Sequence, residues 1–109
     1  MSTPVWIVTL PGVMTLDLTG PAEALQLAQG HFSLRYIGPQ ESVITSTDMT
    51  ISQIAPLPET LPAGSLLLLP GASDSQRWFA TPQAQQTSRW LMRLQPQIHS
   101  QAITLVCIC

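Results

Sequence analysis

The stretch Ser65-Leu66-Leu67-Leu68-Leu69-Pro70-Gly71-Ala72 contains four consecutive leucines followed by a Pro-Gly turn signal. Two further segments, Val5–Leu10 and Ala102–Ile108, are largely apolar and lack helical spacing. Runs of this kind are typical of strands covered on both faces, as in a parallel sheet, although periodicity alone does not distinguish them from a short buried helix. Each run is bounded by a breaker or by the end of the chain, which favours strands.

Two segments between these runs carry helix signals. The sequence Gly20-Pro21-Ala22-Glu23 predicts a helix that begins at its proline and ends at Gly30. A second helix is predicted to begin at Thr81-Pro82 and to run to Gln95, where the next residue is again a proline. The expected apolar face of this second helix comprises Ala84, Ser88, Leu91 and Leu94.

The remaining segments complete an α/β pattern. Phe32–Ile37 alternates and predicts a half-exposed strand near a sheet edge, and Val43–Ile54 predicts a small β-hairpin. Residues 55–62 contain three prolines and predict an extended connector. The order of elements therefore predicts a mostly parallel sheet flanked by helices and joined by right-handed crossovers. In such sheets ligands bind beyond the carboxyl ends of the strands.

The composition excludes several classes of function. The chain has 109 residues, 45% hydrophobic and 9% charged, with a net charge of −2 and four arginines as its only basic residues besides histidine. This length fits one domain, and such a charge balance cannot supply the positive field that nucleic-acid binding needs. Pro11 and Gly12 interrupt the N-terminal apolar run, which has no basic region before it, so we expect neither a signal peptide nor a membrane span and infer a cytoplasmic location.

Candidate site residues follow the predicted strands. Asp17 lies between two leucines after the first strand, where burial would raise its pKa and let it donate a hydrogen bond; an exposed loop or capping carboxylate is the alternative. Gly71 allows a turn that aims a backbone N–H at the strand ends, as an oxyanion donor requires. Cys109 follows the last strand as a candidate nucleophile, whereas we expect Cys107 to be a buried core residue.

Other chemistries lack support. The pair Cys107 and Cys109 does not have zinc-ligand spacing with His31 or His99, so we expect no metal site. The glycines are too widely spread for a dinucleotide or phosphate loop, and we expect no cofactor. The two cysteines, separated by one residue, are expected to be reduced thiols.

Four blocks of sequence, residues 16–23, 44–51, 67–72 and 104–109, resemble the first half of the DJ-1/PfpI superfamily, whose class I glutamine-amidotransferase-like fold is flavodoxin-like. The resemblance is strongest to the domain found at the N-terminus of AraC-type transcriptional regulators. It implies that residues 1–109 form a partial domain that stops after the strand leading to the nucleophile elbow. The elbow helix and all later elements would then be missing.

The resemblance also implies roles for the candidate residues. Cys109 would lie at the elbow, Asp17 would hydrogen-bond its thiol, and Gly71 would supply the oxyanion-type N–H. Two positions depart from the superfamily pattern. Asp48 replaces a hairpin glycine, which is tolerable because aspartate visits left-handed conformations, and Ala72 replaces a second glycine near the expected ligand.

The function implied is a ligand-sensing or dimerisation domain of an AraC-type regulator, with a small-molecule ligand and with DNA recognition in a part missing from this chain. The alternative is a thiol-dependent hydratase or hydrolase that uses Cys109 and Asp17. We expect these 109 residues to lack enzymatic activity, because half of the elbow is absent. An uncovered central strand should also promote self-association. A truncated product with only structural behaviour is a third possibility.

Overall fold

Four parallel strands form the central sheet of the computed structural model, which describes residues 2–72 and 80–108. The strands are β1 (Thr3–Val8), β2 (Phe32–Ile37), β5 (Leu66–Pro70) and β6 (Thr104–Ile108). Their order is β2-β1-β5-β6, and Val5 of β1 pairs with Leu34 on one side and with Leu66 on the other. The predicted parallel sheet, with Phe32–Ile37 at its edge, is confirmed.

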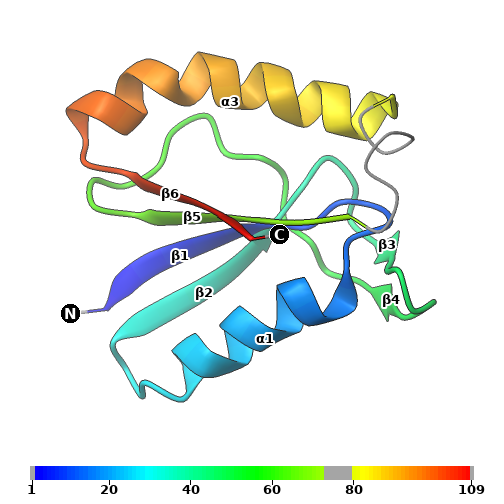
Figure 1. Cartoon of the computed structure of the whole chain (residues 1–109). Coiled ribbons are helices and arrows are strands. Elements are labelled where there is room, and N and C mark those ends of the chain that lie inside the picture. The colour runs from blue at the N-terminus through cyan, green and yellow to red at the C-terminus, as the bar shows by residue number, and fades with distance from the viewer. Residues whose placement is uncertain (1, 73–79, 109) are drawn as a thin grey trace.

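Two helices cover opposite faces of this sheet, so that the molecule has three layers (Figure 1). Helix α1 (Thr15–Gln26) covers one face, and helix α3 (Pro82–Ser100) covers the other. Each helix closes its own apolar cluster. The cluster under α1 contains Val5, Ile7, Val13, Leu18, Ala22 and Leu68. The cluster under α3 contains Val8, Leu10, Ile37, Leu61, Leu67, Trp90, Leu94 and Ile103.

Helix α1 begins earlier than predicted. Its first residue is Thr15, and the backbone N–H of Leu18 donates to the carbonyl of Met14 over 3.1 Å. Pro21 therefore lies inside the helix, where it has no N–H to donate to the carbonyl of Asp17. The predicted start at Pro21 is wrong because burial of Leu18 and Ala22 in the sheet interface outweighs the local proline signal.

Helix α3 begins as predicted and ends later. The hydroxyl of Thr81 caps the helix by accepting a hydrogen bond from the N–H of Ala84 over 3.2 Å. The predicted end at Gln95 is wrong, since the helix continues through Pro96 to Ser100. Tertiary contacts hold the last turn: the side-chain amide of Gln97 donates to the carbonyl of Leu61 and accepts from its N–H.

A small antiparallel hairpin packs beside the start of α1. Strands β3 (Val43–Ile44) and β4 (Thr50–Ile51) form it, as predicted. Asp48 adopts a left-handed conformation with φ of 63°, which is the backbone that its position was expected to require. The hydroxyl of Thr15 donates to the hydroxyl of Thr45 over 2.8 Å and lies 2.6 Å from that of Thr47. The hairpin is thereby tied to the first turn of α1.

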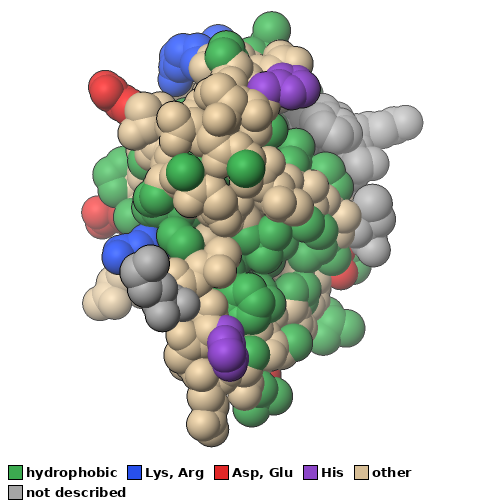
Figure 2. Space-filling view, turned by 90° about the vertical axis from the view of Figure 1, so that its left-hand side faces the viewer, with side chains coloured by type: hydrophobic (Ala, Val, Ile, Leu, Met, Phe, Trp, Pro, Cys, Tyr) green, Lys and Arg blue, Asp and Glu red, His purple; other side chains and the backbone are tan. Residues whose placement is uncertain are grey.

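The outer surface carries few charges. Figure 2 shows hydrophobic side chains spread over one face of the molecule, with acidic and basic groups confined to isolated positions. Within residues 2–72 and 80–108, neither helix combines the length and the apolar character needed to cross a bilayer.

Candidate functional site

A cavity of about 480 Å³ lies where the carboxyl ends of β1, β5 and β6 meet the start of α1 and the first turns of α3. We call it the strand-end cavity. Its position is the one predicted for a ligand site in a parallel α/β sheet. It brings Asp17 and Gly71, two of the predicted site residues, to one place. Its lining comprises Val8, Leu10, Met14, Asp17, Leu69, Pro70, Gly71, Ala72, Ala84, Thr87, Ser88, Leu91, Cys107 and Ile108.

Among the described residues of this lining, Asp17 has the one charged side chain. It is the third residue of α1, and its Oδ2 atom is buried without a hydrogen-bond partner; no other buried side-chain polar atom in the described ranges lacks one. A buried acceptor without a donor is unfavourable, because the hydrogen bond it made to water is not replaced. An N–H or O–H group placed beside this oxygen would satisfy it.

The loop around Gly71 joins the end of β5 to the entry of α1. The carbonyl of Gly71 accepts a hydrogen bond from the N–H of Met14 over 2.9 Å, and Val13 forms an isolated antiparallel bridge with Ala72. These contacts fix the distance between the β5 end and the first turn of α1, which carries Asp17. An oxyanion role for the N–H of Gly71 stays a prediction.

The predictions for the two cysteines differ in how the structure bears on them. Cys109 lies outside the described residues. Cys107 also lines the cavity, and the prediction that it is a buried core residue is wrong, because its side chain is exposed. Strand β6 lies at the edge of the sheet, and Leu105, two residues away and on the same face, is 43% exposed. A continuous apolar run predicts burial on both faces, but a strand at a sheet edge is covered less.

Helix α3 forms one wall of the strand-end cavity, and only part of this wall lies on the apolar face predicted from the sequence. Ala84, Ser88 and Leu91 line the cavity and belong to the apolar face predicted for this helix. Thr87 was missed: it is buried in the same wall, and its hydroxyl is satisfied by the carbonyl of Gln83 over 2.9 Å. Its spacing of three residues from Ala84 was the available signal. Ser88 is exposed to solvent, although it was expected on the buried side.

The donor set does not resemble a metal centre. No group of three or more histidine, cysteine, aspartate or glutamate side chains is placed to hold a metal ion in the part of the chain that the structure describes. The described residues that line the strand-end cavity offer one carboxylate and one thiol among mostly apolar groups. This arrangement suits a small organic ligand better than an ion.

Comparison with known proteins defines the class of fold. No family profile matches the sequence, and no curated protein matches it either. Solved structures do match, and they show that the chain has a flavodoxin-like α/β fold. The resemblance inferred from the four sequence blocks is thus confirmed at the level of the fold.

Three solved structures illustrate the likeness. The VC2308 protein aligns with 100% of this chain and 53% of its own at 20% identity and a TM-score of 0.70. For DJ-1beta of Drosophila melanogaster, the alignment covers 100% of this chain and 56% of DJ-1beta, at 19% identity and a TM-score of 0.68. For an AraC family transcriptional regulator from Pseudomonas putida, the alignment covers 94% of this chain and 63% of the regulator, at 16% identity and a TM-score of 0.66. The chain spans a little over half the length of the first two structures.

Proposed function

We propose that the chain is a ligand-sensing domain of an AraC-type transcriptional regulator that acts in the cytoplasm. The observation that carries this proposal is the unpartnered Oδ2 of Asp17 in the strand-end cavity. The fold likeness to an AraC family regulator supports the regulator part. DNA would be contacted by another part of the protein, because the net charge of −2 and the scarcity of basic residues disfavour contact by this one.

The lining limits the chemistry of the ligand. Most of it is aliphatic, so an apolar body is favoured, and the buried carboxylate oxygen selects a hydrogen-bond donor attached to that body. A site with an unpaired buried acceptor discriminates strongly against an analogue that lacks the donor, since that analogue leaves the acceptor unsatisfied. We therefore expect small apolar amides or amines to bind better than ketones of the same shape.

Benzamide and acetophenone provide this test, because they share a ring and a carbonyl and differ in the amide N–H. In NMR titrations benzamide should bind at least threefold more tightly than acetophenone and shift the backbone signals of residues 14–18 and 69–72. Asp17→Asn should reduce the preference, and Asp48→Asn, a change in the hairpin and outside the described lining of the cavity, should leave it intact. Equal binding of both probes, or binding that ignores Asp17→Asn, would refute the sensing site.

The regulator part has a separate test. The coding sequence beyond the Cys109 codon should encode the rest of the α/β domain followed by two helix-turn-helix units. A stop codon directly after a completed α/β domain would instead favour the enzyme.

The thiol enzyme is the alternative, and it depends on Cys109. Alkylation of Cys109 in the full-length protein should then abolish turnover of small nitriles, isonitriles or amides, with Asp17 moving the proton. Under the sensing proposal no such turnover exists in the full-length protein, so measurable turnover that alkylation stops would decide for the enzyme.

We also propose that the 109-residue chain self-associates through β6. This strand lies at the edge of the sheet and exposes Leu105 and Cys107 beside each other. Edge strands with exposed apolar side chains pair readily with a second copy. Light scattering should show a dimer or larger species, and Leu105→Lys should shift it toward monomer. A single monomeric species over a wide concentration range would contradict this.

A further inference from the structure

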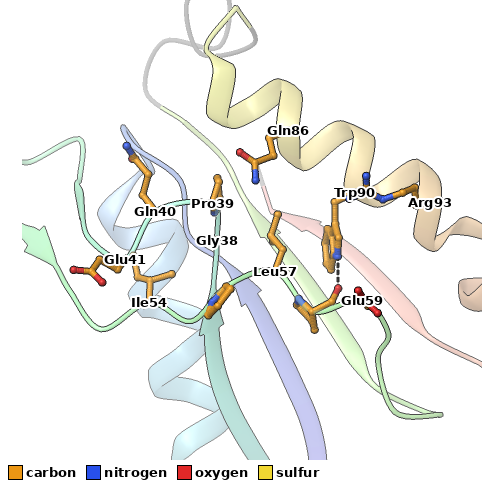
Figure 3. A pocket seen from close by; sticks show the side chains of 12 residues that line it. Gly38, Pro39, Gln40, Glu41, Ile54, Leu57, Glu59, Gln86, Trp90 and Arg93 are labelled. Carbon is orange, nitrogen blue, oxygen red and sulfur yellow. Dashed lines mark hydrogen bonds between the residues drawn. The ribbon is translucent and has the colours of Figure 1, made fainter.

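A second and larger hollow lies away from the strand-end cavity. It has a volume of about 770 Å³ and runs between α3 and two connecting segments, the turn after β2 and the proline-rich connector (Figure 3). We call it the α3 groove. No described residue lines both this groove and the strand-end cavity. Its volume falls within the range of small-molecule sites.

The walls of the α3 groove are held in place by hydrogen bonds. The indole N–H of Trp90 donates to the carbonyl of Pro58 over 2.6 Å, dashed in Figure 3. The N–H of Gly38 donates to the carbonyl of Ala55 over 2.9 Å, and the N–H of Ile54 donates to the carbonyl of Glu41 over 3.0 Å. A ligand would therefore meet a wall that needs little reordering, which favours affinity.

Close packing shapes the floor. A Cβ atom on Gly38 would lie 2.6 Å from the backbone oxygen of Thr9, so this position accepts only glycine without a backbone shift. Leu57 and Ile54 contribute apolar side chains, and three prolines in the lining have no N–H that needs a partner. The middle of the groove is thus apolar.

Charged groups lie toward the ends of this apolar middle. Figure 3 shows Arg93 of α3 at one end and Glu41 at the other, with Glu59 nearer to the arginine. Within the described residues no ion pair joins Arg93 to either glutamate, and all three side chains are exposed. The guanidinium and the Glu41 carboxylate are consequently available to a ligand.

From this layout we propose that the α3 groove binds a small zwitterion of about the size of a dipeptide. Its carboxylate pairs with Arg93, whose fork of N–H groups matches a carboxylate. Its ammonium lies at Glu41, and its apolar side chains cover Leu57 and the prolines. This inference is independent of the proposed sensing site, because neither Asp17 nor Gly71 contributes to the groove.

The dipeptide Leu-Leu tests the proposal beside two blocked forms, N-acetyl-Leu-Leu without the ammonium and Leu-Leu amide without the carboxylate. NMR titration of the whole 109-residue chain should shift the indole signal of Trp90, assigned with Trp90→Phe. Each blocked form should bind about three- to fivefold more weakly, as expected for an exposed ion pair. Equal binding of all three peptides, or no shift at millimolar Leu-Leu, would overturn the proposal.

Matched variants locate the charges. Arg93→Gln should remove the preference for Leu-Leu over its amide, whereas Arg89→Gln, one turn earlier on the same helix and outside the groove, should preserve it. Glu41→Gln should remove the preference over the acetylated form. Glu59→Gln should tighten binding slightly, because it removes a negative charge near the ligand carboxylate. A loss of preference in Arg89→Gln equal to that in Arg93→Gln would assign the effect to net charge and refute the site.

Asp17→Asn separates this inference from the proposed function. The substitution should leave Leu-Leu binding unchanged while it weakens benzamide binding. Leu-Leu binding that falls with Asp17→Asn would place the peptide in the strand-end cavity and contradict the α3 groove.

Discussion

The α1 layer and the α3 layer of the same sheet satisfy their polar groups in different ways. On the α3 side, the Trp90 indole donates to the proline-rich connector, and the Gln97 amide makes two hydrogen bonds to Leu61. On the α1 side, Asp17 presents a buried oxygen with no partner. These buried polar groups of α3 are thus paired within the protein, whereas the Asp17 oxygen of α1 is left unpaired.

This contrast indicates where substitutions should damage the fold and where they should improve it. Residues that hold α3 to the connector are expected to be costly to replace. Asp17 is expected to behave as functional residues often do, lowering stability in return for binding.

Trp90→Ala should have the largest effect. The side chain is 3% exposed and packs in the α3 cluster. Its loss should lower the free energy of unfolding by about 3–5 kcal/mol through the cavity left behind. Urea unfolding followed by circular dichroism measures this. Met92→Ala, on the same helix but 72% exposed, serves as the control and should change little. A similar loss of stability in both variants would contradict the assignment of the Trp90 effect to packing.

A pair of glycine substitutions compares the α3 side with the α1 side directly. Gly38→Ala should destabilise by about 1–3 kcal/mol, because the new Cβ meets the Thr9 oxygen at 2.6 Å. Gly20→Ala should stabilise by about 0.5–1 kcal/mol, because it lies inside α1 and its new Cβ meets only Leu16 Cδ1 at 3.8 Å. Thermal unfolding of the two variants should therefore shift in opposite directions; shifts of the same sign would contradict the packing assigned to one of them.

Asp17→Leu should raise stability. Removing the unpartnered oxygen should raise the free energy of unfolding by about 1–3 kcal/mol. Losing a favourable charge in the first helical turn should lower it by about 0.3–1 kcal/mol, so a net gain of about 1 kcal/mol is expected. Chemical unfolding of the ligand-free protein measures the gain. Asp17→Asn, which keeps an oxygen at this place, should gain less. A clear loss of stability in Asp17→Leu would mean that the carboxylate is structural.

Tyr36, which packs on the α1 side of the sheet, should make the stability of the protein fall slightly at alkaline pH. Burial raises the pKa of its phenol above the ordinary value of 10.0, and the charge of Glu23 raises that pKa further. Because the folded-state pKa is raised, the stabilisation is complete below about pH 10 and is lost as the pH rises through the raised pKa. Urea unfolding between about pH 8 and pH 11.5 should show a fall that is smaller in Tyr36→Phe. An identical fall in both would assign it to other groups.

Much of the fold could be predicted from the sequence because apolar runs report burial. The strands around Val5, Leu67 and Leu105 and the cap at Thr81 follow from local patterns. The helix boundaries at Pro21 and Pro96 could not be predicted, since tertiary packing outweighs the lost hydrogen bond at each proline. Among the candidate site residues, Asp17 and Gly71 were predicted from their positions after strands, and both line the strand-end cavity. The exposure of Cys107 was not predicted, because sequence periodicity does not tell a central strand from an edge strand.

The sequence by itself determined the alternation of strands and helices, the parallel sheet and the end of the sheet where a ligand site belongs. These follow from local hydrophobic patterning and from the chirality of the chain. Only the tertiary structure decided that Oδ2 of Asp17 is left without a partner and that Arg93 and Glu41 lie at opposite ends of one groove. Both features depend on which segments, distant in the chain, pack against each other, and no local pattern contains that information.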